Sequence, residues 1–143
     1  MPTPVKTSRL AQLLSGGDRR SIGGSDIAAE EILRSPSLAR ALLECLFHAD
    51  SRVRMRAADA LEKASAQNPE LLRPFKPELL GLLVEERQKE VRWHLAQMVP
   101  RLQLTPAERR RAMSALRDYL QDSSSIVKTF AMQALTELAG ERQ

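Results

Sequence analysis

The sequence contains few of the residues that form catalytic or metal centres. Its 143 residues include one cysteine, Cys45, and two histidines, His48 and His94. A single cysteine excludes an internal disulfide and fits a reducing compartment, so we expect a cytoplasmic protein. No Cys, His and carboxylate cluster has the spacing of metal ligands, and no titratable pair is arranged for acid–base chemistry. We therefore expect no enzyme activity, no metal and no cofactor, and we expect Cys45 to be a buried apolar residue.

Long apolar runs and aromatic residues are also scarce. No stretch approaches the roughly 18 apolar residues of a membrane span, and the start, MPTPVKTSRL, lacks the apolar run of a signal peptide. Aromatic residues make up 3% of the chain, whereas leucine, alanine, arginine and glutamate are plentiful, which favours helix. No segment shows the alternation of a strand. The composition thus predicts an all-α globular protein that does not enter a membrane.

A nine-residue pattern occurs three times. VRMRAADAL at 53–61 is followed by VRWHLAQMV at 91–99 and VKTFAMQAL at 127–135, and the copies begin 38 and 36 residues apart. Their apolar positions recur at i, i+4, i+7 and i+8, which places them on one helical face. A further helix is predicted before each copy, at about 36–47, 75–84 and 106–120. A helix pair with this period is typical of an α-solenoid, so the pattern predicts packing rather than a site.

Capping signals support these boundaries. TPAE at 105–108 has the pattern of a capping box with proline at the first helical position. Ser35-Pro36 and Asn68-Pro69 predict similar helix starts, and either Ser123 or Ser124 can cap the last helix. Pro100 is expected to distort the end of the second copy.

The repeated stretch resembles the second helix of HEAT repeats, whose V-R-x-x-A-x-x-A-L pattern matches Val53 to Leu61 at every marked position. The second copy departs from it at Leu95 and Pro100. The resemblance implies a right-handed α-α superhelix in one domain, with three helix pairs at 35–66, 68–102 and 104–140. Residues 1–34 do not fit the period, and we interpret them as an N-terminal cap with helices at about 5–14 and 26–34.

The resemblance also implies roles for charged residues beside the repeat. In HEAT proteins, acids in the turn and the base after the valine form a ladder between neighbouring repeats. The matching positions are Asp50, Arg54, Arg92, Asp122 and Lys128, with Glu86 as the nearest acid in the second copy. These residues are therefore expected to have a structural role.

The opposite side of each second helix is expected to line the concave surface. Its positions are Arg52, Met55, Arg56, Asp59 and Lys63, then Glu90, Trp93, His94, Gln97 and Arg101, then Ile126, Thr129, Phe130, Gln133 and Glu137. The candidate partner-binding residues among them are Met55, Arg56, Trp93, His94, Gln97, Arg101, Ile126 and Phe130. Two alternatives stay open: Trp93 folds back onto the adjacent repeat, or Ile126 and Phe130 pack inward against the helix at 106–120.

Two further segments are rich in arginine. GGDRRSIGG at 16–24 contains a candidate anion site, Asp18, Arg19 and Arg20, although the sequence favours a simple connector between two helices. Arg109, Arg110 and Arg111 are consecutive on a helix, so they cannot form one flat patch and are expected to be solvated.

These features predict a non-catalytic scaffold or adaptor that binds a protein or peptide along its concave face. The net charge of +4 keeps nucleic-acid binding through a basic groove as an alternative, although Asp59, Glu90 and Glu137 on the same face oppose it. An accessory subunit of an enzyme is a further alternative that rests on fold analogy alone. The apolar residues Ile126 and Phe130 of the last helix also allow a homodimer.

Overall fold

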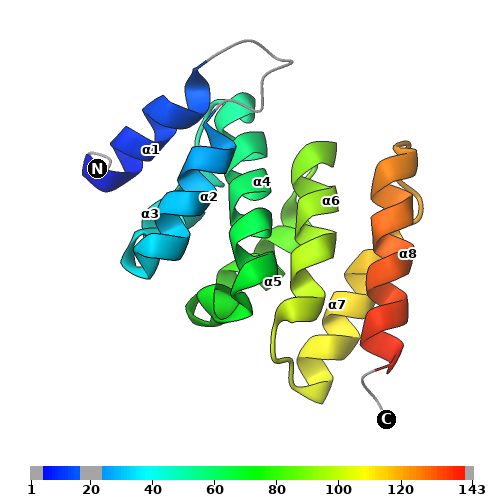
Figure 1. Cartoon of the computed structure of the whole chain (residues 1–143). Coiled ribbons are helices and arrows are strands. Elements are labelled where there is room, and N and C mark those ends of the chain that lie inside the picture. The colour runs from blue at the N-terminus through cyan, green and yellow to red at the C-terminus, as the bar shows by residue number, and fades with distance from the viewer. Residues whose placement is uncertain (1–4, 17–23, 141–143) are drawn as a thin grey trace. The chain divides into compact units, whose positions relative to one another are not determined.

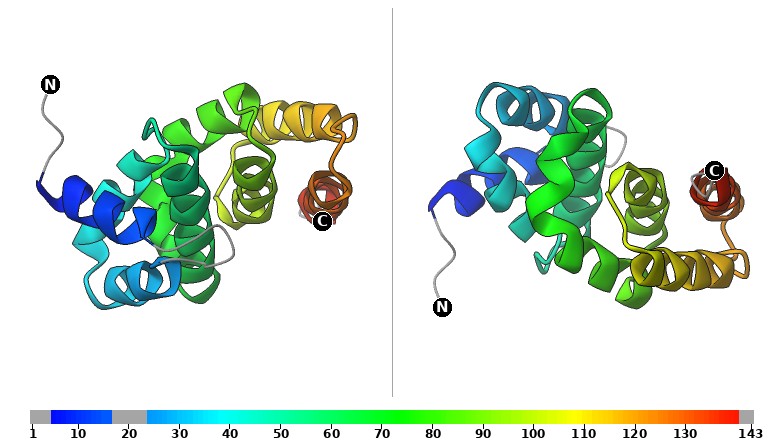
Figure 2. Two further views of the ribbon diagram at one scale, coloured as in Figure 1. Left: turned by 90° about the horizontal axis from the view of Figure 1, so that it is seen from above. Right: turned by 90° about the horizontal axis from the view of Figure 1, so that it is seen from below.

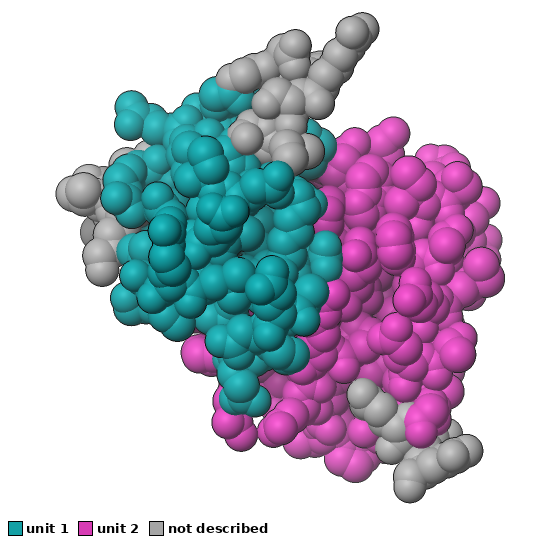
Figure 3. Space-filling view, in the orientation of Figure 1, with its two compact units in different colours: residues 1–71 teal, residues 72–143 magenta. Residues whose placement is uncertain are grey.

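The computed structural model describes residues 5–16 and 24–140, and these residues form eight α-helices and three short 3-10 helices with no strand among them (Figure 1). The prediction of an all-α fold is confirmed. The chain divides into two compact units, Met1–Leu71 and Leu72–Gln143 (Figure 3). The expectation of a single domain stays a prediction.

The first unit contains two helix pairs. Helices α1 (Val5–Ser15) and α2 (Ser25–Arg34) form the N-terminal pair, and the turn η1 (Pro36–Leu38) leads into α3 (Ala39–Cys45) and α4 (Ser51–Gln67). Helix α1 packs on α3, and α2 packs on α4. The segment expected to cap the repeats is therefore itself a helix pair that packs on the next pair.

The second unit also contains two helix pairs. After η2 (Pro69–Phe75), which crosses the unit boundary, come α5 (Lys76–Glu85) and α6 (Lys89–Met98), then η3 (Val99–Arg101), α7 (Pro106–Tyr119) and α8 (Ser125–Gly140). Helix α5 packs on α7, and α6 packs on α8. Figure 2 views α6 and α8 nearly end on and shows that they lie side by side, and α7 packs on α8. The unit thus has an α5–α7 layer and an α6–α8 layer.

The repeated positions form much of the core. Eleven of the twelve aligned apolar residues are at most 2% exposed, and only Leu135 is half-buried. The buried set comprises Val53, Ala57, Ala60, Leu61, Val91, Leu95, Met98, Val99, Val127, Ala131 and Ala134. The packing role that the repeat predicted is thereby confirmed.

The capping predictions are confirmed in part. The Thr105 hydroxyl accepts the Glu108 amide at 3.2 Å, and the Glu108 carboxylate accepts the Thr105 amide at 2.8 Å, which completes the capping box. The hydroxyl of Ser124 accepts the Val127 amide at 3.3 Å. Pro36 and Pro69 begin 3-10 turns instead of α-helices, and both turns lead directly into an α-helix, where such turns are frequent. Pro100 lies in η3, so it ends α6 as expected.

In the first two copies, the base that follows the repeat valine binds the preceding turn. Arg54 donates to the carbonyl of His48 at 2.7 Å, and Arg92 donates to that of Glu86 at the same distance, six positions upstream in both cases. The last carbonyls of a helix lack partners within it, so each arginine satisfies an acceptor at the turn between two paired helices. This recurring bond explains why a base follows the valine.

The predicted ladder is present between α6 and the turn before α8. Arg92 also donates to the Asp122 carboxylate at 2.8 Å and lies over the Tyr119 ring at 4.6 Å. In the first unit, by contrast, the carboxylate of Asp50 caps α4 through the amide of Arg52 at 2.9 Å, and Arg54 binds backbone carbonyls. Lys128 is exposed. The ladder prediction thus holds for Arg92 and Asp122, whereas Asp50 and Arg54 bind within their own turn.

The Asp122 carboxylate is expected to make stability depend on acid pH. The Ser124 amide, followed by Arg92, lowers the pKa of Asp122 below its ordinary value. A lowered folded pKa stabilises the fold above the unfolded pKa of about 3.9, and this contribution is lost as the pH falls through the folded pKa. Replacing Asp122 by asparagine should therefore cost about 1–3 kcal/mol at neutral pH, since a charge-assisted hydrogen bond is lost.

Urea denaturation of Asp122→Asn and the wild type across the acid range tests this prediction. The difference in unfolding free energy should shrink below about pH 4. Asp118→Asn is the control, because Asp118 is exposed on α7. A difference that stays constant down to strong acid would contradict a role for the Asp122 charge.

Candidate functional site

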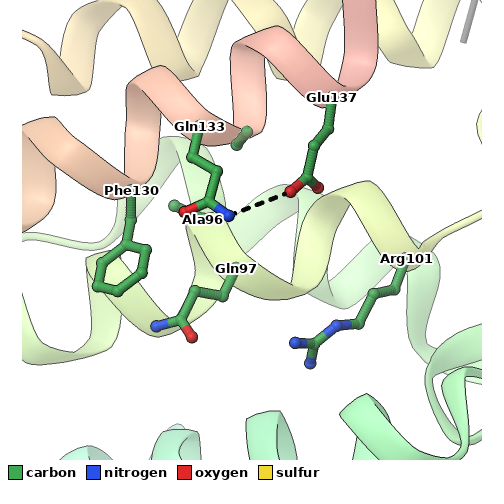
Figure 4. A pocket seen from close by; sticks show the side chains of 7 residues that line it. Ala96, Gln97, Arg101, Phe130, Gln133 and Glu137 are labelled. Carbon is green, nitrogen blue, oxygen red and sulfur yellow. Dashed lines mark hydrogen bonds between the residues drawn. The ribbon is translucent and has the colours of Figure 1, made fainter. Parts of the chain in front are cut away.

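A groove lies between α6 and α8 on the second unit. It is lined by Ala96, Gln97 and Arg101 from the α6 side and by Phe130, Gln133, Ala134 and Glu137 from α8 (Figure 4). Five of these seven residues belong to the face that the sequence predicted to be concave: Gln97, Arg101, Phe130, Gln133 and Glu137. The structure therefore brings two predicted stripes together at one place.

Small residues form the floor of the groove. Ala96 and Ala134 are buried, with 0% and 2% of their surface exposed. Because helix separation depends on the side chains at the contact, two alanines let α6 and α8 approach closely. The longer side chains of the neighbouring positions then stand along the two rims.

The chemical character of the lining changes along the groove, from an aromatic ring through carboxamides to charged groups. Figure 4 shows Phe130 at one end, Gln97 and Gln133 in the middle, and Arg101 with Glu137 at the other end. The carboxamide of Gln133 donates to Glu137 at 3.4 Å, and that of Gln97 donates to the Trp93 carbonyl at 3.4 Å. Both bonds are longer than the usual 2.9–3.0 Å or so, which makes them easy to exchange for bonds to a partner.

The size and chemistry of the groove suit a polypeptide better than a small ligand. Its volume is about 150 Å³, below the roughly 300–1,000 Å³ of typical small-molecule pockets. Each glutamine carboxamide both donates and accepts, which matches the alternating donors and acceptors of a peptide backbone. The groove can therefore hold one or two side chains of a partner while its rims bind the backbone.

The other stripe residues of the second unit differ in exposure. Ile126 is 46% exposed, and Phe130 is half-buried in the groove, so the inward packing of Ile126 on α7 is not observed. Trp93 is half-buried and contacts the His94 ring at 5.7 Å between centroids. The prediction that His94 is exposed is wrong: it is 8% exposed, and its Nδ1 donates to the Glu90 carbonyl at 2.6 Å.

Arg56 was also predicted to bind a partner, and its burial contradicts an exposed position. It is 2% exposed, and its guanidinium donates to the carbonyls of Leu14 and Gly16 at 2.7 and 2.8 Å. These carbonyls at the end of α1 have no N–H donor within the helix, and the buried guanidinium of Arg56 supplies one. Met55, next to it on α4, is half-buried.

Sequence reasoning missed a charged cluster on the first unit. The ammonium of Lys63 binds Asp26 at 2.6 Å and Asp59 at 3.0 Å, which links α4 to α2. Partial burial alone would lower the pKa of Lys63, but the hydrogen bonds to the two carboxylates outweigh it and raise the pKa. Asp59 also accepts from the buried Ser25 hydroxyl at 2.8 Å. The cluster acts as a link between helices.

The other candidates from the sequence are the cysteine and the two arginine-rich segments, and no metal site is expected. Burial, with a smaller contribution from the charge of Glu44, raises the pKa of the Cys45 thiol to about 11, and the residue is fully buried as predicted. Arg110 and Arg111 are exposed. The candidate anion site at Asp18, Arg19 and Arg20 lies outside the described residues. Over residues 5–16 and 24–140, no group of three or more His, Cys, Asp or Glu side chains is arranged to hold a metal ion.

Two further observations concern the whole described chain. None of its helices is both long enough and apolar enough to cross a membrane. No protein-family model and no curated protein sequence matches the chain.

The fold is similar to that of an engineered protein with a known crystal structure. The TM-score is 0.57 at 21% sequence identity, and the match covers 94% of this chain. It covers 64% of the engineered protein, so the chain spans less than two thirds of that protein's length. At this identity the likeness concerns the fold alone.

Proposed function

We propose that the protein is a non-catalytic adaptor that binds a protein or peptide partner through the α6–α8 groove. The observation that supports this proposal is the convergence of Gln97 and Arg101 with Phe130 and Gln133 from the next repeat, around a recess of side-chain size. A half-exposed aromatic ring beside hydrogen-bonding groups is typical of interface hot spots. The proposal includes a HEAT-like solenoid as the scaffold and the cytoplasm as the compartment.

The chemistry of the groove favours this function over nucleic-acid binding and catalysis. A nucleic-acid groove needs a continuous positive surface, whereas Glu137 lies on the rim beside Arg101. The residues of the groove include no nucleophile with an adjacent base. A peptide, in contrast, can use the carboxamides, the aromatic end and the two opposite charges of Arg101 and Glu137 together.

Phe130→Glu is expected to remove partner binding and to leave the helical melt nearly unchanged. The partner is first captured from an extract of the source cells with the wild-type chain and identified by mass spectrometry. Its affinity for the variant should then fall at least about tenfold, because a carboxylate replaces a ring at the end of the groove. Thr129→Glu, which adds the same charge at an exposed neighbouring position, should keep the affinity.

Three outcomes would count against the proposal. If Thr129→Glu and Phe130→Glu weaken binding equally, the groove is not the contact. If Phe130→Glu sharply lowers the melting temperature, the ring belongs to the core. Binding of a mixed DNA duplex below about a micromolar at physiological salt, with a steep salt slope, would favour a nucleic-acid-binding function.

A further inference from the structure

A second groove lies in the other layer of the second unit, between α5 and α7. It consists of two adjoining hollows of about 320 and 280 Å³, which share Leu83, Val84 and Arg111. Each is about twice as large as the α6–α8 groove and reaches the lower range of known ligand pockets, roughly 300 Å³. Together they form a continuous furrow along the two helices.

The wall and floor of the α5–α7 groove are apolar. Leu80, Gly81 and Val84 form the α5 side, and Val84 is 59% exposed. Ala112 and Ala115 of α7 line it from the other side, and both are buried. When a partner covers apolar surface of this kind, the free energy of the system falls, because the surface is removed from water.

Gly81 keeps the groove open at a cost to its helix. It lies inside α5, where glycine is less favourable than alanine. A Cβ atom added to Gly81 would meet nothing within 4 Å, so packing within the described residues does not require a glycine. The absence of a side chain instead leaves room beside α5 for atoms from outside.

The charges at one end of the groove are mainly positive. Arg87 and Arg111 are both exposed and line this end from the two sides, and within the described residues neither makes an ion pair. Arg92 also lines it but binds Asp122. Asp118 is the one carboxylate among the lining residues described. A partner with carboxylates would therefore find two exposed arginines that make no ion pair within the described residues.

We propose that the α5–α7 groove binds an amphipathic helical segment of a partner protein that carries acidic residues beside its apolar face. Its apolar side chains lie over Gly81 and Val84, and a carboxylate binds between Arg87 and Arg111. Helices with an apolar stripe commonly bind in grooves between two helices. This site goes beyond the proposed function, because it uses the other helix layer and would leave the α6–α8 groove accessible.

Fluorescence polarisation with the full chain tests the proposal. The probes are an array of short labelled helical peptides with leucines at i and i+4 flanked by glutamates, together with sets in which every glutamate is replaced by glutamine or lysine. The glutamate set should contain binders, and the glutamine and lysine sets should bind at least about tenfold more weakly. If no glutamate peptide binds, or if the glutamine peptides bind equally, the proposal is wrong.

Two variants locate the binding. Gly81→Trp should fill the groove and weaken the best peptide at least about tenfold, whereas Gly81→Ala should keep more of the affinity and hold or raise the melting temperature. Arg111→Glu should weaken it similarly, and Arg110→Glu, an exposed position on the same helix, should leave it within about twofold. Equal losses for the two arginines, or full binding by a folded Gly81→Trp protein, would overturn the proposal. Competition by single-stranded nucleic acid that Arg111→Glu abolishes would overturn it in favour of a nucleic-acid site.

Discussion

Arg56→Ala is expected to lower the free energy of unfolding by about 3–6 kcal/mol, because two hydrogen bonds from a charged donor are lost and each contributes roughly 1.5–3 kcal/mol. The side chain is 2% exposed, and its guanidinium binds the Leu14 and Gly16 carbonyls. Alanine would leave these acceptors without their donor and a space where the long side chain had been. Because both carbonyls lie at the end of α1, the loss should appear first as release of that helix.

Urea denaturation measures the stability, and amide hydrogen exchange measures the release of α1. Arg56→Met retains most of the side-chain volume but has no hydrogen-bond donor. It should therefore restore the packing, but it should not restore the protection of the α1 amides from hydrogen exchange. Arg52→Ala, at an exposed position on the same helix, is the control and should stay within about 1 kcal/mol. An Arg56→Ala protein with wild-type stability that no longer binds its partner would show that the residue is a contact after all.

The helices and most core positions could be predicted from the sequence because one physical rule generates both. Apolar residues at i, i+4, i+7 and i+8 bury one face, and this rule placed Val53, Val91 and Val127 in the core. The capping box at Thr105 was also local, since both of its hydrogen bonds join residues three positions apart. The buried faces and the capping box were therefore predicted correctly, whereas the α-helix starts expected at Pro36 and Pro69 are 3-10 turns.

The prediction for Arg56 failed because periodicity assumes one buried face per helix. Helix α4 contacts α1, α2 and α3, so a wider arc of its surface is covered than its apolar residues indicate. The cover includes backbone carbonyls, which require a donor and not another apolar group. His94 likewise lies at the edge of the buried arc of α6, where it binds a carbonyl of its own helix. No sequence pattern reports where another element presents its carbonyls.

The α6–α8 groove could be predicted in part from the sequence, whereas the α5–α7 groove could not. The α6–α8 groove joins equivalent positions of two repeats, so aligning the copies already grouped Gln97 with Gln133 and Arg101 with Glu137. The α5–α7 groove depends on Gly81, Ala112 and Ala115, which lie on helices without a shared pattern. Its lining combines residues of two helices that share no repeated pattern, so the sequence alone did not indicate it.

Leu95→Ala should cost about 2–5 kcal/mol, the range for truncating a buried leucine and leaving a cavity. Leu95 is 0% exposed and occupies a position where the other two copies have alanine, Ala57 and Ala131. The spacing of α6 from its neighbours is therefore set by a larger side chain, and alanine would leave a space that the surrounding helices cannot fill completely. Gln97→Ala, on the rim of the α6–α8 groove, is the control and should change stability by about 0.5 kcal/mol or less.

Partner binding distinguishes the scaffold from the site in the same experiment. Leu95→Ala and Arg92→Ala should both lower the melting temperature, the first by more, and both should bind the partner normally at temperatures where they are folded. Arg92 has a smaller expected effect because its bonds to Glu86 and Asp122 lie near the surface, with 12% of its side chain exposed. Gln97→Ala should show the opposite behaviour, with unchanged melting and weaker binding. A fully stable Arg92→Ala protein without partner binding would show that the recurring base is a contact residue, and a Leu95→Ala protein as stable as the wild type would show that the repeat does not act as a packing device.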